Sequence, residues 1–330
     1  MGSGYFDPSA SATRARMRAA TGKTAFTHDA AARNGAAPLL HPSLDVTRKP
    51  RRESRDVPGK QPATPIMVWL DVTGSMSQIP GLLIQDLSKL MKLIIDGHIV
   101  TDPQICFAAI GDATSDRVPI QVGEFEADDA LAEGHLSNIF LEGAGGGQAR
   151  ESYEMALWFA GNQVDTDAFD KRQEKGFLFI IGDEAPYTTV RREFAQKFLG
   201  VSISEDVSLR EAVAQASKKF HVFVIRPGGT GHYDSHAVQQ AWETVLPAER
   251  VIKQENWQDI APLLAGTISV MSGESLDDTA IAMKASGFDK SSVDAATRSL
   301  VPLANGSAAP VASGIVRVAG GGSAPLSKRL

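Results

Sequence analysis

Three apolar runs, each ending in an aspartate, constrain the fold of this chain most strongly. They read IMVWLD (residues 66–71), QICFAAIGD (104–112) and FLFIIGD (177–183). A strand that is buried on both faces has such an unbroken apolar sequence, and strands of this kind belong to parallel sheets covered by helices. Segments with helical apolar spacing separate the runs, the clearest of them between Pro80 and Ile95. The sequence therefore predicts an α/β protein.

Three further segments complete the predicted sheet. HVFVIRPGG (221–229) is another apolar run, and a short strand is expected at 250–252. VPIQVGEF (118–125) follows the second run closely enough to pair with it in the antiparallel direction. The alternation of strands with helices favours a doubly wound arrangement, with helices on both faces. We expect a Rossmann-like, mostly parallel six-stranded sheet with one antiparallel edge strand.

The composition divides the chain into three parts. The first 60 residues contain 11 Lys or Arg against 5 Asp or Glu, and six prolines between positions 38 and 65 exclude a long helix from the second half of this segment. We predict a basic, Pro-rich, extended arm over residues 1–64 and a core domain over 65–271. Residues 272–330 are rich in Gly, Ala and Ser, which predicts a loosely held tail with one amphipathic patch at 281–293.

Charge and cysteine content argue against several classes of protein. The net charge is -6, and an acidic body is unsuited to general nucleic-acid binding, which depends on neutralising phosphates. The single cysteine, Cys106, excludes an internal disulfide and a metal site built from cysteines. The first residues lack the apolar core of a signal peptide, and no stretch approaches ~18 uninterrupted apolar residues. We therefore expect a cytoplasmic protein that binds neither membranes nor nucleic acid.

The three aspartates that end the apolar runs fall where α/β sheets bind ligands, at the carboxyl ends of the strands. The first belongs to the turn DVTGSMS (71–77), in which Asp71, Thr73 and Ser75 offer a carboxylate and two hydroxyls. All three are hard oxygen donors, which suit Mg²⁺ or Mn²⁺. Asp183 is expected at the same site, and Asp112 is expected to support the ligands from behind.

The motif LDVTGSMS resembles the D-x-S/T-x-S metal-ion-dependent adhesion site of von Willebrand factor A domains, with Thr73 at the position of the commoner serine. The resemblance spans about residues 65–271 and includes the order of strands and helices, a glycine-rich loop before a helix, and the later strand-end aspartate. It implies that Thr73 and Ser75 bind the metal directly, while Asp71 and Asp183 act largely through bound waters and hydrogen bonds. A carboxylate from another protein would then complete the metal's coordination shell.

One ligand of the resembled site is missing from this chain. Such domains usually supply a further threonine from the glycine-rich loop, which here reads GAGGGQARES (143–152) without a threonine. Gln148 is the nearest positional counterpart, and Glu151 and Ser152 are the alternatives that can reach inward. A glutamate in this position would make the metal less electrophilic and weaken the binding of a partner.

A closer likeness concerns the segment before the first strand. The chain looks especially similar to prokaryotic and phage-borne A-domain proteins in which HPS and RESRD blocks, here residues 41–43 and 52–56, stand at this place. The resemblance implies a protein-interaction module that depends on Mg²⁺ or Mn²⁺ and is not an enzyme. Its expected partner is a protein that offers an acidic side chain to the metal. A MoxR-type AAA+ ATPase is one such partner class, by analogy with bacterial A-domain adaptors.

Three alternatives stay open from the residues themselves. Hydroxyls of the turn, among them Thr73 and Ser77, can simply cap the following helix. The order D-x-T-G-S is also similar to the loop of haloacid dehalogenase-type phosphotransferases, which would make Asp71 a magnesium-dependent phosphoryl acceptor. Against this, the second carboxylate of that loop is missing, and the nearby basic residues Lys218 and Lys219 follow the GDE strand. The third alternative is a scaffold with a vestigial site, motivated by the missing threonine.

Overall fold

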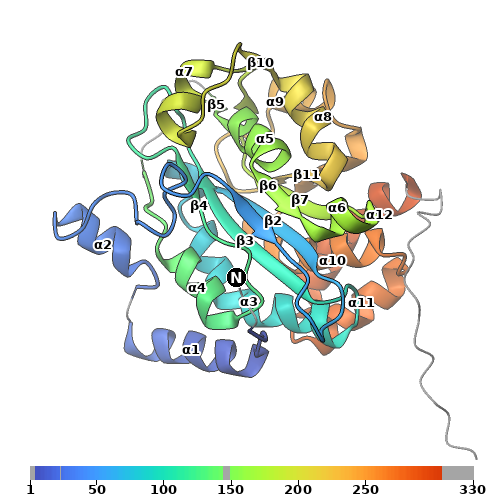
Figure 1. Ribbon diagram of the computed structural model, residues 1–330. Helices are drawn as coiled ribbons and strands as arrows, with labels where there is room; N and C mark the ends of the chain where they lie inside the picture. The colour runs from blue at the N-terminus through green and yellow to red at the C-terminus, as the bar shows by residue number, and fades with distance from the viewer. Residues whose placement is uncertain (1–3, 23, 144–148, 307–330) are drawn as a thin grey trace, which may run out of the picture.

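The computed structural model describes residues 4–22, 24–143 and 149–306, and a six-stranded sheet forms its centre (Figure 1). The strands lie in the order β12-β11-β7-β2-β3-β4, and all neighbours are parallel except β3 and β4. This confirms the predicted mostly parallel sheet with one antiparallel edge strand. The bounds are β2 Thr64–Asp71, β3 Pro103–Ile110, β4 Ile120–Val122, β7 Gly176–Ile181, β11 Phe220–Pro227 and β12 Val251–Gln254.

Helices cover both faces of the sheet, because successive residues of its buried strands point to opposite sides. Val68 of β2 belongs to the apolar core of one face, and its neighbour Trp69 belongs to the core of the other. The first face is covered by α3 Ile79–Asp96, α10 Ile260–Met271, α11 Leu276–Ala285 and α12 Lys290–Gly306. The second is covered by α5 Tyr153–Asn162, α8 Leu209–Lys219 and α9 His236–Glu243. None of the helices in the described part of the chain has the length and hydropathy needed to cross a membrane.

Short elements fill the connections, and one pair of them joins the loops at the carboxyl edge of the sheet. Strand β5, which follows the glycine-rich loop, pairs in parallel with β8, which follows Asp183. The pairing brings these two loops together beside the ends of β2 and β7. The short elements are η1 Gly74–Met76, α4 Asp129–Ser137, β5 Arg150–Glu151, β6 Val164–Thr166, α6 Asp167–Arg172, β8 Ala185–Pro186, β9 Thr189–Val190, α7 Arg192–Phe194, η2 Ala195–Leu199, β10 Val207–Ser208, η3 Ala248–Arg250 and η4 Trp257–Asp259.

The segment before β2 is folded onto the domain, which differs from the extended arm expected from its composition. It contains α1 Pro8–Thr21, α2 Thr27–Arg33 and β1 Arg52–Ser54. Phe6 and Phe26 are buried in the core of the first face, and Arg14 of α1 pairs with acidic residues of α4. Widely spaced aromatic anchors and these ion pairs hold the segment, a pattern that composition alone does not reveal. In the second half of this segment, where prolines exclude a long helix, the described residues form none.

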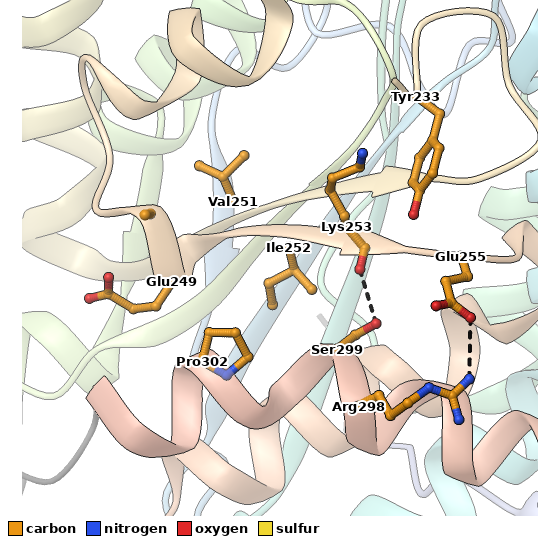
Figure 2. Close-up of a pocket in the computed structure, with 10 residues that line it drawn as sticks. Tyr233, Glu249, Val251, Ile252, Lys253, Glu255, Arg298, Ser299 and Pro302 are labelled. Atoms are coloured by element: carbon orange, nitrogen blue, oxygen red, sulfur yellow. Dashed lines mark hydrogen bonds and ion pairs between the residues drawn. The ribbon is translucent and has the colours of Figure 1, made fainter. Parts of the chain in front are cut away.

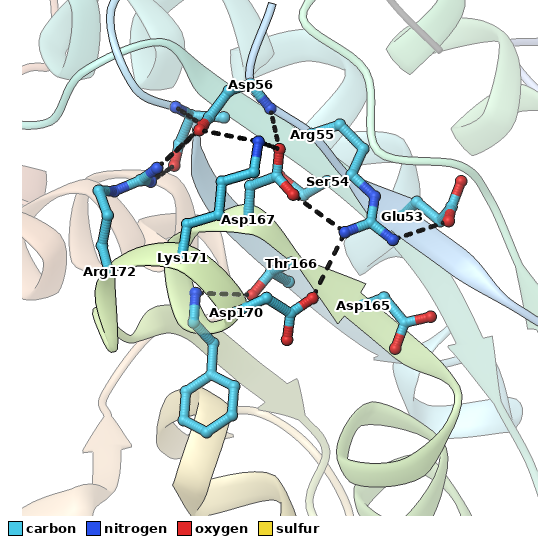
Figure 3. Close-up of polar contacts among 12 residues, drawn as sticks. Glu53, Ser54, Arg55, Asp56, Asp165, Thr166, Asp167, Asp170, Lys171 and Arg172 are labelled. Atoms are coloured by element: carbon cyan, nitrogen blue, oxygen red, sulfur yellow. Dashed lines mark hydrogen bonds and ion pairs between the residues drawn. The ribbon is translucent and has the colours of Figure 1, made fainter.

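The RESRD block fastens this segment to the connection after α5 (Figure 3). Strand β1 pairs in parallel with β6. Arg55 donates to Asp167 at 3.0 Å, and Arg172 donates to Asp56 at 2.8 Å. Arg52 is buried and donates to backbone carbonyls at and just beyond the end of β4. Since these charged groups are matched by nearby partners, the block is structural in this chain.

Helices α11 and α12 pack against α10, which differs from the loose tail expected from residue 272 onward. Met283 and Leu300 lie in the core of the first face. A Cβ at Gly266 of α10 would stand 2.3 Å from the Met283 Cε and 2.8 Å from the Leu300 Cδ1, so the three helices meet closely at this glycine. The chain is therefore helical and packed against the domain through α11 and α12, as far as Gly306.

Candidate metal centre

Asp71 ends β2 in the middle of the sheet and is fully buried. Its Oδ1 accepts hydrogen bonds from the Thr73 backbone N–H at 2.9 Å and from the Thr73 hydroxyl at 2.6 Å. Its Oδ2 accepts from the Tyr153 hydroxyl at 2.6 Å. Burial raises the pKa of Asp71 to about 6; the hydrogen bonds oppose this rise, and the nearby charge of Asp183 adds to it. Asp71 thus fixes both the turn that follows it and the start of α5.

The hydroxyls of Thr73 and Ser77 do not cap a helix, which was one alternative for the turn. Thr73 precedes η1 and Gln78 precedes α3, and neither makes a side-chain capping bond. The Thr73 hydroxyl donates to Asp71 instead, and the Ser77 hydroxyl donates to the Gly74 carbonyl at 3.1 Å. A hydroxyl that donates one hydrogen bond still has lone pairs for a cation. The backbone of Ser75 lies in η1, and its side chain is outside the described part of the structure.

Asp183 lies just beyond the end of β7 and is also fully buried. Its Oδ2 accepts the backbone N–H of His232 at 3.0 Å. The loop that carries His232 is held from beneath by the buried Arg226, which donates to the His232 carbonyl at 2.6 Å. The two aspartates predicted at one site, Asp71 and Asp183, therefore end neighbouring strands, and each is held by a donor from a separate connection.

Tyr153 connects the two acid-bearing strands, and its role was missed in the sequence. It occupies the first turn of α5, where its spacing placed it on the apolar side of the helix. A Cβ at Gly182 of the β7 end would stand 2.1 Å from the Tyr153 hydroxyl oxygen, so only glycine admits the ring there. The ring packs beside Trp242 at 5.5 Å between centroids. Tyr153 thus orients Asp71, and its ring contacts the end of the strand that leads to Asp183.

Glu151 is fully buried in β5, and neither of its carboxylate oxygens has a hydrogen-bond partner among the described residues. Burial raises its pKa to about 11, and negative charges nearby add to the rise, from Asp71, Glu184, Asp116 and Asp112. An unpartnered buried charge is costly, so such a group is stable only when it is protonated or faces a cation. Glu151 is therefore a buried carboxyl group whose oxygen lone pairs have no hydrogen-bond donor among the described residues.

Glu184 and Asp116 enlarge the acidic group beyond the residues expected from the sequence. Burial raises the pKa of Glu184 to about 7, with the charges of Asp71 and Asp183 adding to the effect. Burial likewise raises the pKa of Asp116 to about 6. The GDE sequence contained the signal for Glu184, because the residue after a strand-end aspartate lies at the same edge. The acidic group of this edge comprises Asp71, Asp112, Asp116, Glu151, Asp183 and Glu184.

Asp112 lies beyond the end of β3, one strand away from Asp71, and its carboxylate is saturated with donors. The Thr114 N–H and hydroxyl donate to it at 2.9 and 2.6 Å, and the Tyr187 hydroxyl lies 3.2 Å from both its oxygens. Ser115 adds a further hydroxyl at 3.2 Å. These donors occupy the Asp112 carboxylate, and its supporting role at the metal stays a prediction.

The donors around Asp71 fit a hard divalent cation, provided that hydroxyls take part. Within the described residues no three His, Cys, Asp or Glu side chains are arranged to hold a metal by themselves. Thr73 and Glu151, which has no hydrogen-bond partner among the described residues, offer oxygen donors at this edge of the sheet. Ser152 is directed elsewhere, since its hydroxyl accepts the Ala113 N–H at 2.9 Å. Gln148 lies outside the described residues.

The arrangement offers little to the phosphotransferase alternative. Lys219 lies at the end of α8, immediately before β11, and its amine donates to the Val164 carbonyl of β6. That position is at the amino end of the strand, whereas Asp71 lies at the carboxyl edge of the sheet. Both oxygens of Asp71 also accept hydrogen bonds, which disfavours a role as nucleophile.

A separate pocket lies between β12 and α12, away from the acidic edge (Figure 2). Three of the charged residues that line it, Lys253, Glu255 and Arg298, form ion pairs. Lys253 lies 3.4 Å from Asp234 and against the Tyr233 ring, and Arg298 lies 3.2 Å from Glu255. The pocket contains no residue predicted for the metal site.

Comparisons with known proteins give structural likeness only. No protein-family model matches the chain, and the search of curated proteins gives no match. The open conformation of the pilus adhesin SpaC from Lactobacillus rhamnosus GG is similar with 11% identity and a TM-score of 0.43, over 64% of this chain and 31% of that chain. A von Willebrand factor type A structure from Catenulispora acidiphila is similar with 12% identity and a TM-score of 0.37, over 65% of this chain and 44% of that chain. This chain thus spans less than half the length of either structure, and its doubly wound fold rests on its own strand order and registers.

Proposed function

We propose that the chain is a protein-interaction module of the von Willebrand factor A type, which uses Mg²⁺ or Mn²⁺ at the DVTGSMS turn to bind a partner. The observation that carries the proposal is Glu151, a fully buried carboxylate with no hydrogen-bond partner among the described residues, on which the charge of Asp71 acts. Burying such a carboxylate is unfavourable unless a cation or a proton compensates it. The hard oxygen donors favour Mg²⁺ or Mn²⁺ over softer metals.

Each residue has a distinct part in this proposal. Thr73 and Ser75 are the hydroxyl ligands, as the resemblance implies, and Glu151 takes the place of the missing threonine. Asp71 and Asp183 neutralise the ion and hold the turns around it through the hydrogen bonds described above. When bound, the cation supplies a position that accepts a carboxylate from another protein. The added negative charge of Glu151 is expected to weaken that contact relative to a threonine.

The proposal includes no enzymatic step. Among the described residues, the carboxylate oxygens of Asp71 are occupied by Thr73 and Tyr153, so a covalent role for Asp71 is not supported. We propose an adaptor or scaffold in a prokaryotic or phage complex, with an AAA+ ATPase of the MoxR type as one partner class. This partner class comes from the resemblance alone.

Calorimetric titration with Mg²⁺ and Mn²⁺ tests the proposal directly. The wild type is compared with the double variant Asp71→Ala, Ser75→Ala in buffer without chelators. The matched control is Asp289→Ala, Ser291→Ala, which removes a hydrogen-bonded Asp–Ser pair from the surface at the start of α12. We expect saturable binding in the wild type and the control, and none in the first variant. Absence of binding in the wild type would reject the metal-dependent form of the proposal and favour a scaffold with a vestigial site.

A further inference from the structure

Two arginines from other parts of the chain lie beside the start of the glycine-rich loop, which contacts the DVTGSMS turn. A Cβ at Gly74 would lie 3.5 Å from the Gly143 carbonyl oxygen, so the turn contacts the start of the glycine-rich loop. A Cβ at Gly143 would in turn lie 3.6 Å from an Nη2 atom of Arg33, which comes from α2. Arg117, from the connection between β3 and β4, forms an ion pair with Glu142, just before the same loop. Its Nη2 atom lies 3.5 Å from a carboxylate oxygen of Glu142. We call Arg33 and Arg117 the basic rim.

The aromatic ring of Phe140 holds both guanidinium groups of the basic rim. Arg33 lies 5.0 Å and Arg117 5.1 Å from the centroid of this buried ring, which is within the range of cation–π contact. The acids that pair with them, Asp29 and Glu142, are mostly buried and also accept backbone N–H groups. The guanidinium side chains remain 45% and 58% exposed. The acids therefore point inward, and the arginines present their charge to solvent.

The basic rim offsets the repulsion that the acidic edge of the sheet would exert on an acidic partner. The acidic group at the edge of the sheet, even with one divalent cation, is net negative and repels an acidic partner at short range. Two exposed guanidiniums beside the loop that contacts the metal turn oppose this repulsion. Arg33 already donates to Asp29 and to the Leu141 carbonyl, and the remaining N–H groups of the two guanidiniums can donate to a carboxylate.

We propose that the basic rim is part of the docking surface and binds acidic side chains of the partner that flank the carboxylate on the metal. The inference rests on the proposed function and specifies its partner: an acidic protein segment with at least two carboxylates close together. It also gives a role to the segment before β2, because α2 brings Arg33 to the metal turn. The docking surface is then built from separate parts of the chain.

The test uses a fluorescein-labelled hexaglutamate peptide as probe, with fluorescence anisotropy measured in Mn²⁺ and in chelator. The variant Arg33→Gln, Arg117→Gln is compared with Arg48→Gln, Arg51→Gln, which removes the same charge from exposed arginines of the same segment. We expect metal-dependent peptide binding that the rim variant weakens on the order of tenfold and the control leaves within about twofold. Arg33→Lys, Arg117→Lys keeps the charge and is expected to restore part of the affinity.

Manganese calorimetry on the same variants separates the two proposals. Wild-type protein that binds no Mn²⁺ contradicts the proposed function itself. Wild-type protein that binds Mn²⁺ but shows no metal-dependent peptide binding, or equal peptide affinity in wild type and rim variant, overturns the basic rim alone. If the glutamine variant fails to fold, as judged by lost Mn²⁺ binding, the lysine variant and single substitutions at Arg117 decide: weaker peptide binding with unchanged Mn²⁺ affinity supports the inference, and unchanged peptide binding overturns it.

Discussion

The turns after β2 and β3 share one hydrogen-bonding plan, although only the first is proposed to bind a metal. In each, a fully buried aspartate accepts the N–H of a threonine two residues later at 2.9 Å and its hydroxyl at 2.6 Å. In each, a tyrosine from a later connection donates to the same aspartate. The two sets are Asp71, Thr73 and Tyr153, and Asp112, Thr114 and Tyr187.

Their surroundings differ in one respect that decides their roles. The turn of Asp112 is closed on itself, because Ser115 adds a hydroxyl and the Asp112 N–H donates to Asp116 at 2.8 Å. Among the neighbouring charges that act on Glu151, a buried carboxylate with no donor among the described residues, that of Asp71 has the largest effect. A strand-end aspartate with a threonine is therefore an ordinary turn by itself. The unpartnered carboxylate is what distinguishes a candidate cation site from its structural counterpart.

The largest expected difference between the two turns is in the aspartates. Asp71→Asn should weaken Mn²⁺ binding by a factor on the order of 100 or more, because it removes a charge that holds the ion and its waters. Asp112→Asn should change the affinity by less than about tenfold, since that carboxylate faces only hydroxyls and N–H groups. Calorimetry measures both; equal losses in the two variants would show that the turns act as one site.

A second comparison uses the two buried glutamates near these turns. Glu151→Gln and Glu154→Gln each remove an acid that has unpartnered oxygen and a pKa raised by burial. Each acid must take up a proton to be buried at neutral pH, so both variants should stabilise the metal-free chain by ~1–3 kcal/mol, measured by chemical denaturation in chelator. Only Glu151→Gln should also weaken Mn²⁺ binding, by tens of times. Unchanged Mn²⁺ affinity in this variant would remove Glu151 from the ligands.

The smallest effect is expected from the tyrosine hydroxyls. Tyr153→Phe should lower Mn²⁺ affinity roughly tenfold, because it releases one oxygen of Asp71 from its fixed orientation. Tyr187→Phe should leave the affinity nearly unchanged. Thr279→Val controls for the loss of a buried hydroxyl on the opposite face, where Thr279 and Ser269 share a 2.9 Å hydrogen bond. If Tyr153→Phe and Thr279→Val lost the same Mn²⁺ affinity, the loss would reflect the removal of a buried hydroxyl and not the orientation of Asp71.

The sequence was sufficient for the architecture of the sheet, because strands buried on both faces leave unbroken apolar runs. It also placed Asp71 and Asp183 at one edge, since parallel strands end there together. It did not predict the packing of the first segment or of α11 and α12, which depends on scattered anchors such as Phe6 and Met283. The overall composition of a segment does not show which single residues in it are buried.

The site was predicted less completely than the fold. The spacing assigned Tyr153 to the apolar side of α5, because helical spacing does not predict which group a tyrosine hydroxyl bonds to. Glu151 was one of several candidates, and only its burial without a partner distinguishes it from Ser152, which bonds to Ala113. Tertiary contacts between loops decide these roles, and no local pattern encodes them.

The central position of β2 has a mechanical consequence. Its residues pair with β3 on one side and with β7 on the other, in register along most of its length. A tension that enters at Asp71 and leaves through the start of β2 would pull the strand along its own axis, so both ladders must shear together before it slips. Single-molecule pulling across the strand should therefore give a higher rupture force than pulling that peels β12 from the sheet edge.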